Sequence, residues 1–395
     1  MQGQQWVSQE RKKEISLRVL HINSYYSDHG KPTFYRNFFD AQLKTGLDIS
    51  VFVPVDHSVD PVMAERFGAY SQVVKTHEHR DRYFYHLKQG KALKEAIRRY
   101  RDEKFDIIHA HSLFTNGYVA WKLSETLGVP YIVAVRNREV NTFFRYMIHL
   151  RNTGRKIMAD ADKVIFISEP NKQLVLNRYT PPPLRESMIS KTPVIGNGID
   201  DFWLRSTYRG NRRLEGKELK MLSVGQVIGV KNHLTTAKAA EILIQRGFKV
   251  TLTVVGEKKD ERIFRKLQKY PFLRYLPPAA KEELINVYRE ADIFVLPSIT
   301  ETFGLVYPEA MSQGLPLIYS RGQGFDGQFE EGKVGFHVES RNAEEIADRI
   351  VDITGNYEEI SRNSVDLCTR FNWTDIAREY ERVYRGILSS KGKGQ

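Results

Sequence analysis

Short runs of apolar residues, many of them β-branched, recur through the first half of the chain, and longer segments with apolar residues at helical spacing separate them. Such runs are typical of buried strands, and strands that alternate with helices predict βα units in a parallel, doubly wound sheet. The predicted strands are Leu17–Ile22, Ile49–Val53, Ile107–Ala110, Tyr131–Val135 and Val164–Ser168, and the predicted helices include Pro32–Lys44, Gly90–Arg101 and Tyr118–Leu127.

The pattern breaks at a triple proline and a Gly-Asn-Gly cluster and then begins again, which predicts a second doubly wound domain. We expect domains at 1–193 and 194–372, facing each other across a cleft. Residues 373–395 contain an apolar stripe at helical spacing and are expected to form a helix that packs back on the first domain. The strands predicted in the second domain are Lys220–Val224, Lys249–Val255, Ile293–Leu296 and Leu315–Tyr319.

Length and composition indicate a soluble protein with two cores. A chain of 395 residues exceeds the size at which a single core stops growing, about 250 residues. No apolar run approaches the roughly 18 residues of a membrane-spanning helix, and the N-terminus lacks the apolar stretch of a secretory signal. The single cysteine, Cys368, cannot form an internal disulfide. These features together predict a cytoplasmic protein.

The net charge is +12, and residues 1–200 hold 30 Lys and Arg against 21 Asp and Glu. A basic half suits nucleic acid, an anionic membrane surface or a phosphate-bearing substrate. Because the chain lacks nucleic-acid-binding motifs, we expect no nucleic-acid partner. The segment 136–156 interleaves basic and aromatic residues, which fits either docking at the inner face of the cell membrane or a partly buried helix with a solvated basic face.

The segment 296–311 carries the clearest chemistry. It predicts a strand, a glycine-containing turn and a helix that begins near Gly304, whose free amides suit a diphosphate. Glu309 is expected more than one turn into that helix, where its two carboxylate oxygens suit the hydroxyls of a ribose. Glu301 precedes the helix and is expected nearer the transferred sugar.

Two glutamates separated by seven residues resemble the signature of retaining glycosyltransferases with the GT-B fold, and most closely family 4. The resemblance covers nearly the whole chain in family order, through residues 107–112, 197–200, 224–231, 291–298 and 301–314. It implies transfer of a sugar from a nucleotide diphosphate sugar, with uridine as the commonest nucleoside among relatives. It further implies a saccharide or polyprenyl-linked acceptor in cell-surface polysaccharide synthesis. Retention without a metal or other cofactor is also implied, because a helix dipole and basic side chains stabilise the departing diphosphate.

The resemblance also implies roles for individual residues. Lys231 matches the lysine that neutralises the diphosphate, whereas Gln226 stands where the family usually has arginine. Arg136 replaces a common histidine, which raises the hypothesis of an anionic sugar or a phosphorylated acceptor. With Glu301, Lys231 and Arg136 form the expected catalytic set. The other expected donor-side residues are Gly225, Gly256, Leu276, Phe303, Gly304 and Leu305, and those on the acceptor or phosphate side are Gly30, Lys31, His111 and Asn137.

Other functions stay open. A sugar-nucleotide epimerase on the same fold would alter the donor without an acceptor, and a nucleotide-binding scaffold without activity would fit the substitutions at 136 and 226. The segment 322–327 spells the dinucleotide-binding glycine pattern, but it lies late in the second domain instead of at the first strand-to-helix turn, which argues against a nicotinamide dehydrogenase.

Overall fold

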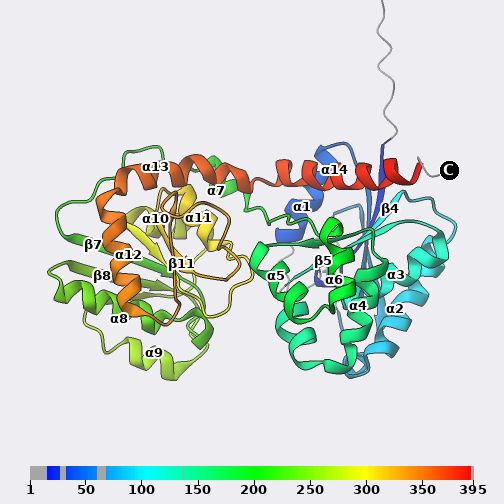
Figure 1. The fold of residues 1–395 in the computed structure, drawn as a ribbon, viewed down its shortest axis with the longest axis horizontal. Coiled ribbons are helices and arrows are strands. Elements are labelled where there is room, and N and C mark those ends of the chain that lie inside the picture. The colour runs from blue at the N-terminus through cyan, green and yellow to red at the C-terminus, as the bar shows by residue number, and fades with distance from the viewer. Residues whose placement is uncertain (1–15, 27–32, 60–67, 137, 393–395) are drawn as a thin grey trace, which may run out of the picture.

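The computed structural model describes residues 16–26, 33–59, 68–136 and 138–392, and these residues form two domains that each hold a parallel sheet (Figure 1). The first sheet has six strands in the order β3-β2-β1-β4-β5-β6. Its strands are β1 (Arg18–Ile22), β2 (Asp48–Asp56), β3 (Ser71–His77), β4 (Ile107–Ala110), β5 (Tyr131–Val135) and β6 (Lys163–Phe166). The helices around it are α1 (Thr33–Lys44), α2 (Tyr85–Tyr100), α3 (Thr115–Leu127), α4 (Arg151–Asp160), α5 (Glu169–Arg178) and α6 (Pro182–Met188), with short turns η3 (His79–Tyr83), η4 (Glu139–Phe144), η5 (Ile148–Leu150) and η6 (Ile189–Lys191).

The second sheet repeats this topology in the order β12-β11-β10-β7-β8-β9. Its strands are β7 (Glu218–Val224), β8 (Lys249–Val255), β9 (Leu273–Leu276), β10 (Ile293–Val295), β11 (Leu317–Ser320) and β12 (Gly335–Val338). Its helices are α7 (Asp201–Arg205), α8 (His233–Gln245), α9 (Glu261–Leu267), α10 (Lys281–Glu290), α11 (Val306–Ser312), α12 (Ala343–Gly355) and α13 (Tyr357–Leu367), with turns η7 (Gly229–Lys231) and η8 (Cys368–Phe371). The predicted class of two Rossmann-like doubly wound domains is confirmed.

Sequence patterns located the central strands but missed three at the edges. The strands β3, β9 and β12 each lie at one edge of a sheet, where they pair on one side only. Each of the three holds several partly exposed or exposed positions, so they lack the continuous apolar run that marks a buried parallel strand. The edge strand β6 was predicted because three of its four residues are buried.

Each sheet is covered on both faces, and alternate residues of one strand enter different cores. On β1, Leu20 and Ile22 enter one core, whereas Val19 enters the other. The C-terminal helix α14 (Trp373–Gly392) contributes Trp373 and Tyr380 to this second core, and both rings contact Phe38 of α1. In Figure 1 α14, drawn in red, runs beside α1, far from it in sequence. None of the helices among the described residues is both long and apolar enough to cross a membrane.

Candidate active site

An ion pair joins two loops at the carboxyl edge of the second sheet. Lys231 ends η7, after β7, and its ammonium donates to a carboxylate oxygen of Glu301 at 2.6 Å. Glu301 follows β10, the neighbour of β7, so the topology brings together residues 70 positions apart. Asn232 has a left-handed backbone (φ 60°), and its amide donates to the carbonyls of Pro297 (2.9 Å) and Ser340. These bonds fix the turn that carries Lys231.

The loop that holds Glu301 is tied to the loop after β11. The side-chain oxygen of Gln323 accepts from the Glu301 N–H at 2.9 Å, and the Gly324 N–H donates to the Glu301 carbonyl at 2.9 Å. A Cβ on Gly324 would lie 2.0 Å from the Thr302 carbonyl group, so only glycine permits this approach. The glycine-rich segment 322–327 therefore supports the Glu301 loop.

Glu309 is partly buried behind this loop. The structure begins α11 at Val306, two residues after Gly304, so Glu309 lies in the first turn and not beyond it as the sequence predicted. Its carboxylate accepts from the Tyr288 hydroxyl at 3.2 Å. Burial raises its pKa to about 8, and the nearby Asp200 carboxylate adds to this rise. Asp200 itself is paired with a lysine at 2.8 Å, which lies on α10.

The ends of β7 and β8 approach each other at two glycines. A Cβ on Gly256 would lie 2.0 Å from the carbonyl oxygen of Gly225, so these two backbones meet without room for a side chain. The Gly256 N–H donates to the carbonyl of Leu276 at 3.2 Å, which ties in β9. Gln226 is exposed at this edge, and its backbone carbonyl contacts His233 at 3.2 Å. The predicted donor-side positions 225, 226, 256 and 276 thus lie together.

Arg136 follows β5 and links the first domain to the segment between the domains. Its Nε donates to the His111 carbonyl at 3.1 Å, and its Nη1 donates to the Asn197 side chain at 3.1 Å. The guanidinium also lies 5.7 and 5.4 Å from the ring centres of Phe34 and Tyr35. Two of its donors are therefore engaged within the protein, where the sequence suggested a contact with an anionic substrate.

The ring of His111 lies in the core and not at the surface. It is fully buried, and its Nε2 lies 3.0 Å from Nδ1 of His21. His109 stacks on it at 4.2 Å and bonds the Tyr384 hydroxyl of α14 at 2.7 Å. Burial lowers the pKa of all three histidines, so the rings are neutral. The charged group that acts on His109 and His111 is the cationic Arg136, so a divalent ion here would gain no compensating anion.

Two family models match the chain in succession. The model described as Glycosyltransferase Family 4 matches residues 30–201, and the model described as Glycosyl transferases group 1 matches residues 205–364. The first covers the strands β2–β6 together with Arg136, and the second covers Lys231, Glu301 and Glu309. The chain is a glycosyltransferase.

The sequence relatives of this chain are also named as glycosyltransferases. The D-inositol 3-phosphate glycosyltransferase of Corynebacterium kroppenstedtii is 25% identical over 311 residues, which are 72% of this chain and 68% of that protein. An uncharacterised glycosyltransferase of Methanocaldococcus jannaschii is also 25% identical, over 74% of this chain and 78% of that protein.

Solved structures share the fold. A sucrose-phosphate synthase from Thermosynechococcus elongatus matches with a TM-score of 0.72 at 18% identity, covering 95% of this chain and all of that one. Anabaena HepE, solved in complex with UDP, matches with a TM-score of 0.69 at 15% identity, covering 94% of this chain and all of that one. At these identities the likeness shows the GT-B fold alone.

Several contacts of the glycosyltransferase join its two domains beside the Glu301 loop. The Thr302 carbonyl accepts from the hydroxyl of Ser168, after β6, at 3.2 Å and from the side chain of Asn171 at 3.1 Å. Phe303 is buried, and its ring leaves no space for a side chain at Gly196. Leu305 is half-buried just before α11. The predicted residues Gly30, Lys31 and Asn137 lie outside the described residues.

Sequence reasoning missed residues that act only through tertiary contacts. Tyr288, Gln323 and Asn232 support the two glutamates and the lysine, and no pattern in the sequence assigns any of them to the site. Glu139 was also missed. It is fully buried, one of its oxygens accepts from the Arg136 N–H at 3.0 Å, and burial raises its pKa to about 7. An acidic residue soon after a strand that ends at the site was the available signal.

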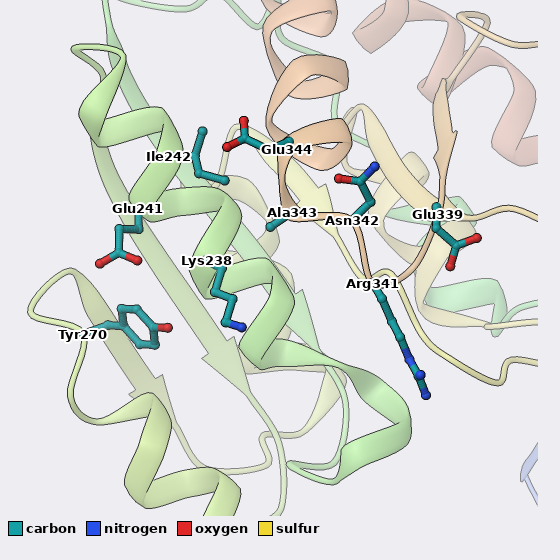
Figure 2. Close-up of a pocket in the computed structure, with 9 residues that line it drawn as sticks. All are labelled: Lys238, Glu241, Ile242, Tyr270, Glu339, Arg341, Asn342, Ala343 and Glu344. Carbon is teal, nitrogen blue, oxygen red and sulfur yellow. The ribbon is translucent and has the colours of Figure 1, made fainter.

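A cavity of about 590 Å³ lies elsewhere on the second domain, between α8 and α12 (Figure 2). Side chains of both charges line it, and none of the predicted site residues does. Figure 2 shows Lys238 and Glu241 on α8, and Asn342 and Glu344 at the start of α12. This mixed, open lining gives the cavity no chemistry in common with the Lys231–Glu301 pair.

Proposed function

We propose that this glycosyltransferase moves a sugar from a nucleotide diphosphate sugar, UDP-linked, to a saccharide or lipid-linked acceptor with retention of configuration. The observation that carries the proposal is the Lys231–Glu301 ion pair at the carboxyl edge of a doubly wound sheet, with the partly buried Glu309 on the next helix. Ligands of such sheets bind outside the carboxyl ends of the strands.

Each residue has a separate part in the proposed reaction. Lys231 neutralises the leaving diphosphate, for which an ammonium is suited as a compact point charge. Glu309 accepts hydrogen bonds from the ribose hydroxyls, and Glu301 accepts them from the transferred sugar. The acceptor hydroxyl attacks from the face that the diphosphate leaves, and the departing phosphate takes its proton. Because the lysine supplies positive charge, this scheme has no step that requires a metal.

The proposed nucleotide and acceptor follow the relatives. UDP is the nucleotide in the HepE structure, and D-inositol 3-phosphate appears in the name of several relatives. A phosphorylated polyol is therefore one acceptor to test beside saccharides. Arg136 holds the His111 carbonyl and Asn197, so we assign it to fixing the two domains relative to each other instead of to binding the donor sugar. A role in cell-surface polysaccharide synthesis, on the cytoplasmic side of the membrane, belongs to the same proposal.

The test is a thermal-shift screen against UDP, GDP, ADP and NAD, followed by turnover of the matching sugar donors. We expect UDP to stabilise the protein and UDP release to require Lys231. Stabilisation by NAD alone would contradict the proposal. Conversion of the donor sugar without an acceptor and without UDP release would instead indicate an epimerase, and nucleotide binding without any turnover would indicate a scaffold.

A further inference from the structure

Large apolar side chains are exposed on two short segments of the first domain. Tyr83 and Phe84, between η3 and α2, are 72% and 63% exposed. Tyr146 and Ile148, between η4 and η5, are 67% and 65% exposed. We call residues 79–88 and 138–149 together the two-segment surface. Leu87, one turn into α2, adds a further exposed apolar side chain to it.

The two segments pack side by side although about fifty residues separate them. Tyr85, the first residue of α2, contacts the ring of Phe143 edge-on at 6.4 Å and donates to the Phe114 carbonyl at 2.6 Å. The ring of Phe114 stacks on Phe143 at 4.6 Å. Lys88 and Arg138, one from each segment, are close enough for their charges to repel. The exposed apolar residues therefore form one surface.

The charge of this surface is positive. Its two segments contain five Lys and Arg and two acids, and both acids are buried. Asp81 is paired with Lys91 at 2.6 Å, and Glu139 lies in the core. The same arrangement recurs in each segment, because Arg82 lies 4.8 Å from the ring centre of Tyr83 and Arg145 lies 5.1 Å from that of Tyr146.

Exposed tyrosine rings beside arginines suit the boundary between lipid headgroups and acyl chains. The aromatic body enters the interface, and the guanidinium remains with anionic headgroups. A protein partner would be equally able to cover apolar residues, but five cations in two segments whose own acids are both buried match a surface of uniform negative charge. The charge pattern therefore selects an anionic bilayer as the occupant.

The two-segment surface lies at the carboxyl edge of the first sheet. The η4 segment begins three residues after Arg136, at the carboxyl end of β5, and η3 follows the carboxyl end of β3. Both segments thus leave the edge of the sheet that also carries Arg136 and its contact with Asn197. We propose that the two-segment surface docks on anionic lipid bilayers and holds this edge of the first domain against a membrane that carries the acceptor. This inference rests on the proposed function and names the location of its acceptor.

The experiment is flotation of the purified full chain with vesicles of phosphatidylcholine alone or phosphatidylcholine with phosphatidylglycerol. We expect binding only to the mixed vesicles, with loss at high salt. Since each basic residue at an anionic surface contributes roughly fivefold to partitioning, Arg82→Gln with Arg145→Gln should weaken binding by roughly 25-fold. Phe84→Ser with Ile148→Ser should weaken binding at high lipid charge as well.

Matched controls lie outside the surface. Arg262→Gln with Lys269→Gln removes two exposed cations from the second domain, and Ile189→Ser removes an exposed apolar residue. Equal losses in the control variants would overturn the proposal, as would binding that is indifferent to lipid charge. A dimer in solution that Phe84→Ser with Ile148→Ser dissolves would identify a second copy as the occupant and also overturn it. Donor hydrolysis in solution should be unchanged in all variants, so its absence in the wild type would count against the proposed function alone.

Discussion

Replacing Glu309 by glutamine should stabilise the protein at neutral pH. Burial raises the pKa of Glu309 to about 8, above the ordinary value of 4.5, so the folded state keeps a proton that the unfolded chain releases. The contribution of Glu309 to the free energy of unfolding is therefore largest below about pH 4.5. It falls as the pH rises toward 8 and is constant above that value. Between pH 5 and pH 7 the loss from this one group is about 2.5 kcal/mol.

The Glu309→Gln variant tests this reasoning because its side chain has the same size and cannot ionise. Its amide oxygen can still accept from the Tyr288 hydroxyl, which now lies 3.2 Å from the carboxylate. Urea unfolding of the wild type and the variant at pH 5 and pH 7 gives the difference directly. We expect the advantage of the variant to grow by about 2.5 kcal/mol over this interval. Nucleotide binding should weaken by roughly tenfold, because the amide of glutamine offers one acceptor oxygen where the carboxyl group of Glu309 offers two.

The control is Glu282→Gln, which changes an exposed carboxylate on α10 in the same domain. Its stability should follow that of the wild type at both pH values. Parallel curves for the wild type and Glu309→Gln would refute the reasoning, since they would mean that Glu309 ionises in the folded state as readily as in the unfolded chain. A variant that is more stable and yet binds nucleotide as well as the wild type would remove Glu309 from the proposed ribose site.

Three further substitutions probe the site. Lys231→Met should lower kcat by about 10²- to 10³-fold in steady-state assays, since it removes the proposed stabilisation of the leaving group, and an unchanged kcat would exclude that role. Gly324→Ala should displace the Glu301 loop and reduce donor turnover, whereas Gly355→Ala, where a Cβ meets nothing within 4 Å, should not. Arg136→Ala should lower the free energy of unfolding in urea by about 1–3 kcal/mol, because two partly buried hydrogen bonds are lost. An unaltered midpoint would argue against its bridging role.

The extent to which the fold could be predicted depends on the position of each strand. Strands such as Ile107–Ala110 and Tyr131–Val135 are buried along their whole length, and their apolar runs stand out in the sequence. The edge strands β3, β9 and β12 are half-exposed, so their mixture of polar and apolar residues resembles that of many loops. The start of α11 was placed near Gly304, whereas this glycine, at φ +78°, still belongs to the turn and the helix begins two residues later at Val306.

The sequence singled out site residues that lie in motifs but not the residues that contact them. Lys231 and Glu301 were singled out separately, but their ion pair depends on β7 and β10 being neighbours, which periodicity alone does not specify. The bonds of Arg136 to a backbone carbonyl and to Asn197 follow from the packing of the domains. An arginine after a strand is equally able to face a ligand, so the sequence favoured the functional interpretation over the structural one.

The two glutamates of the motif have different surroundings in the structure. They are the same residue type with seven residues between them, yet Glu301 is held by an ammonium at 2.6 Å and Glu309 by a neutral hydroxyl in a partly buried site. Removing the charge of Glu301 leaves Lys231 without its partner, whereas removing that of Glu309 relieves a cost of burial. In the proposed reaction the diphosphate takes over Lys231, which releases Glu301 toward the hydroxyls of the sugar. Donor binding would then prepare the residue that orients the sugar, and Glu309 would carry a standing cost in stability for its contact with the ribose.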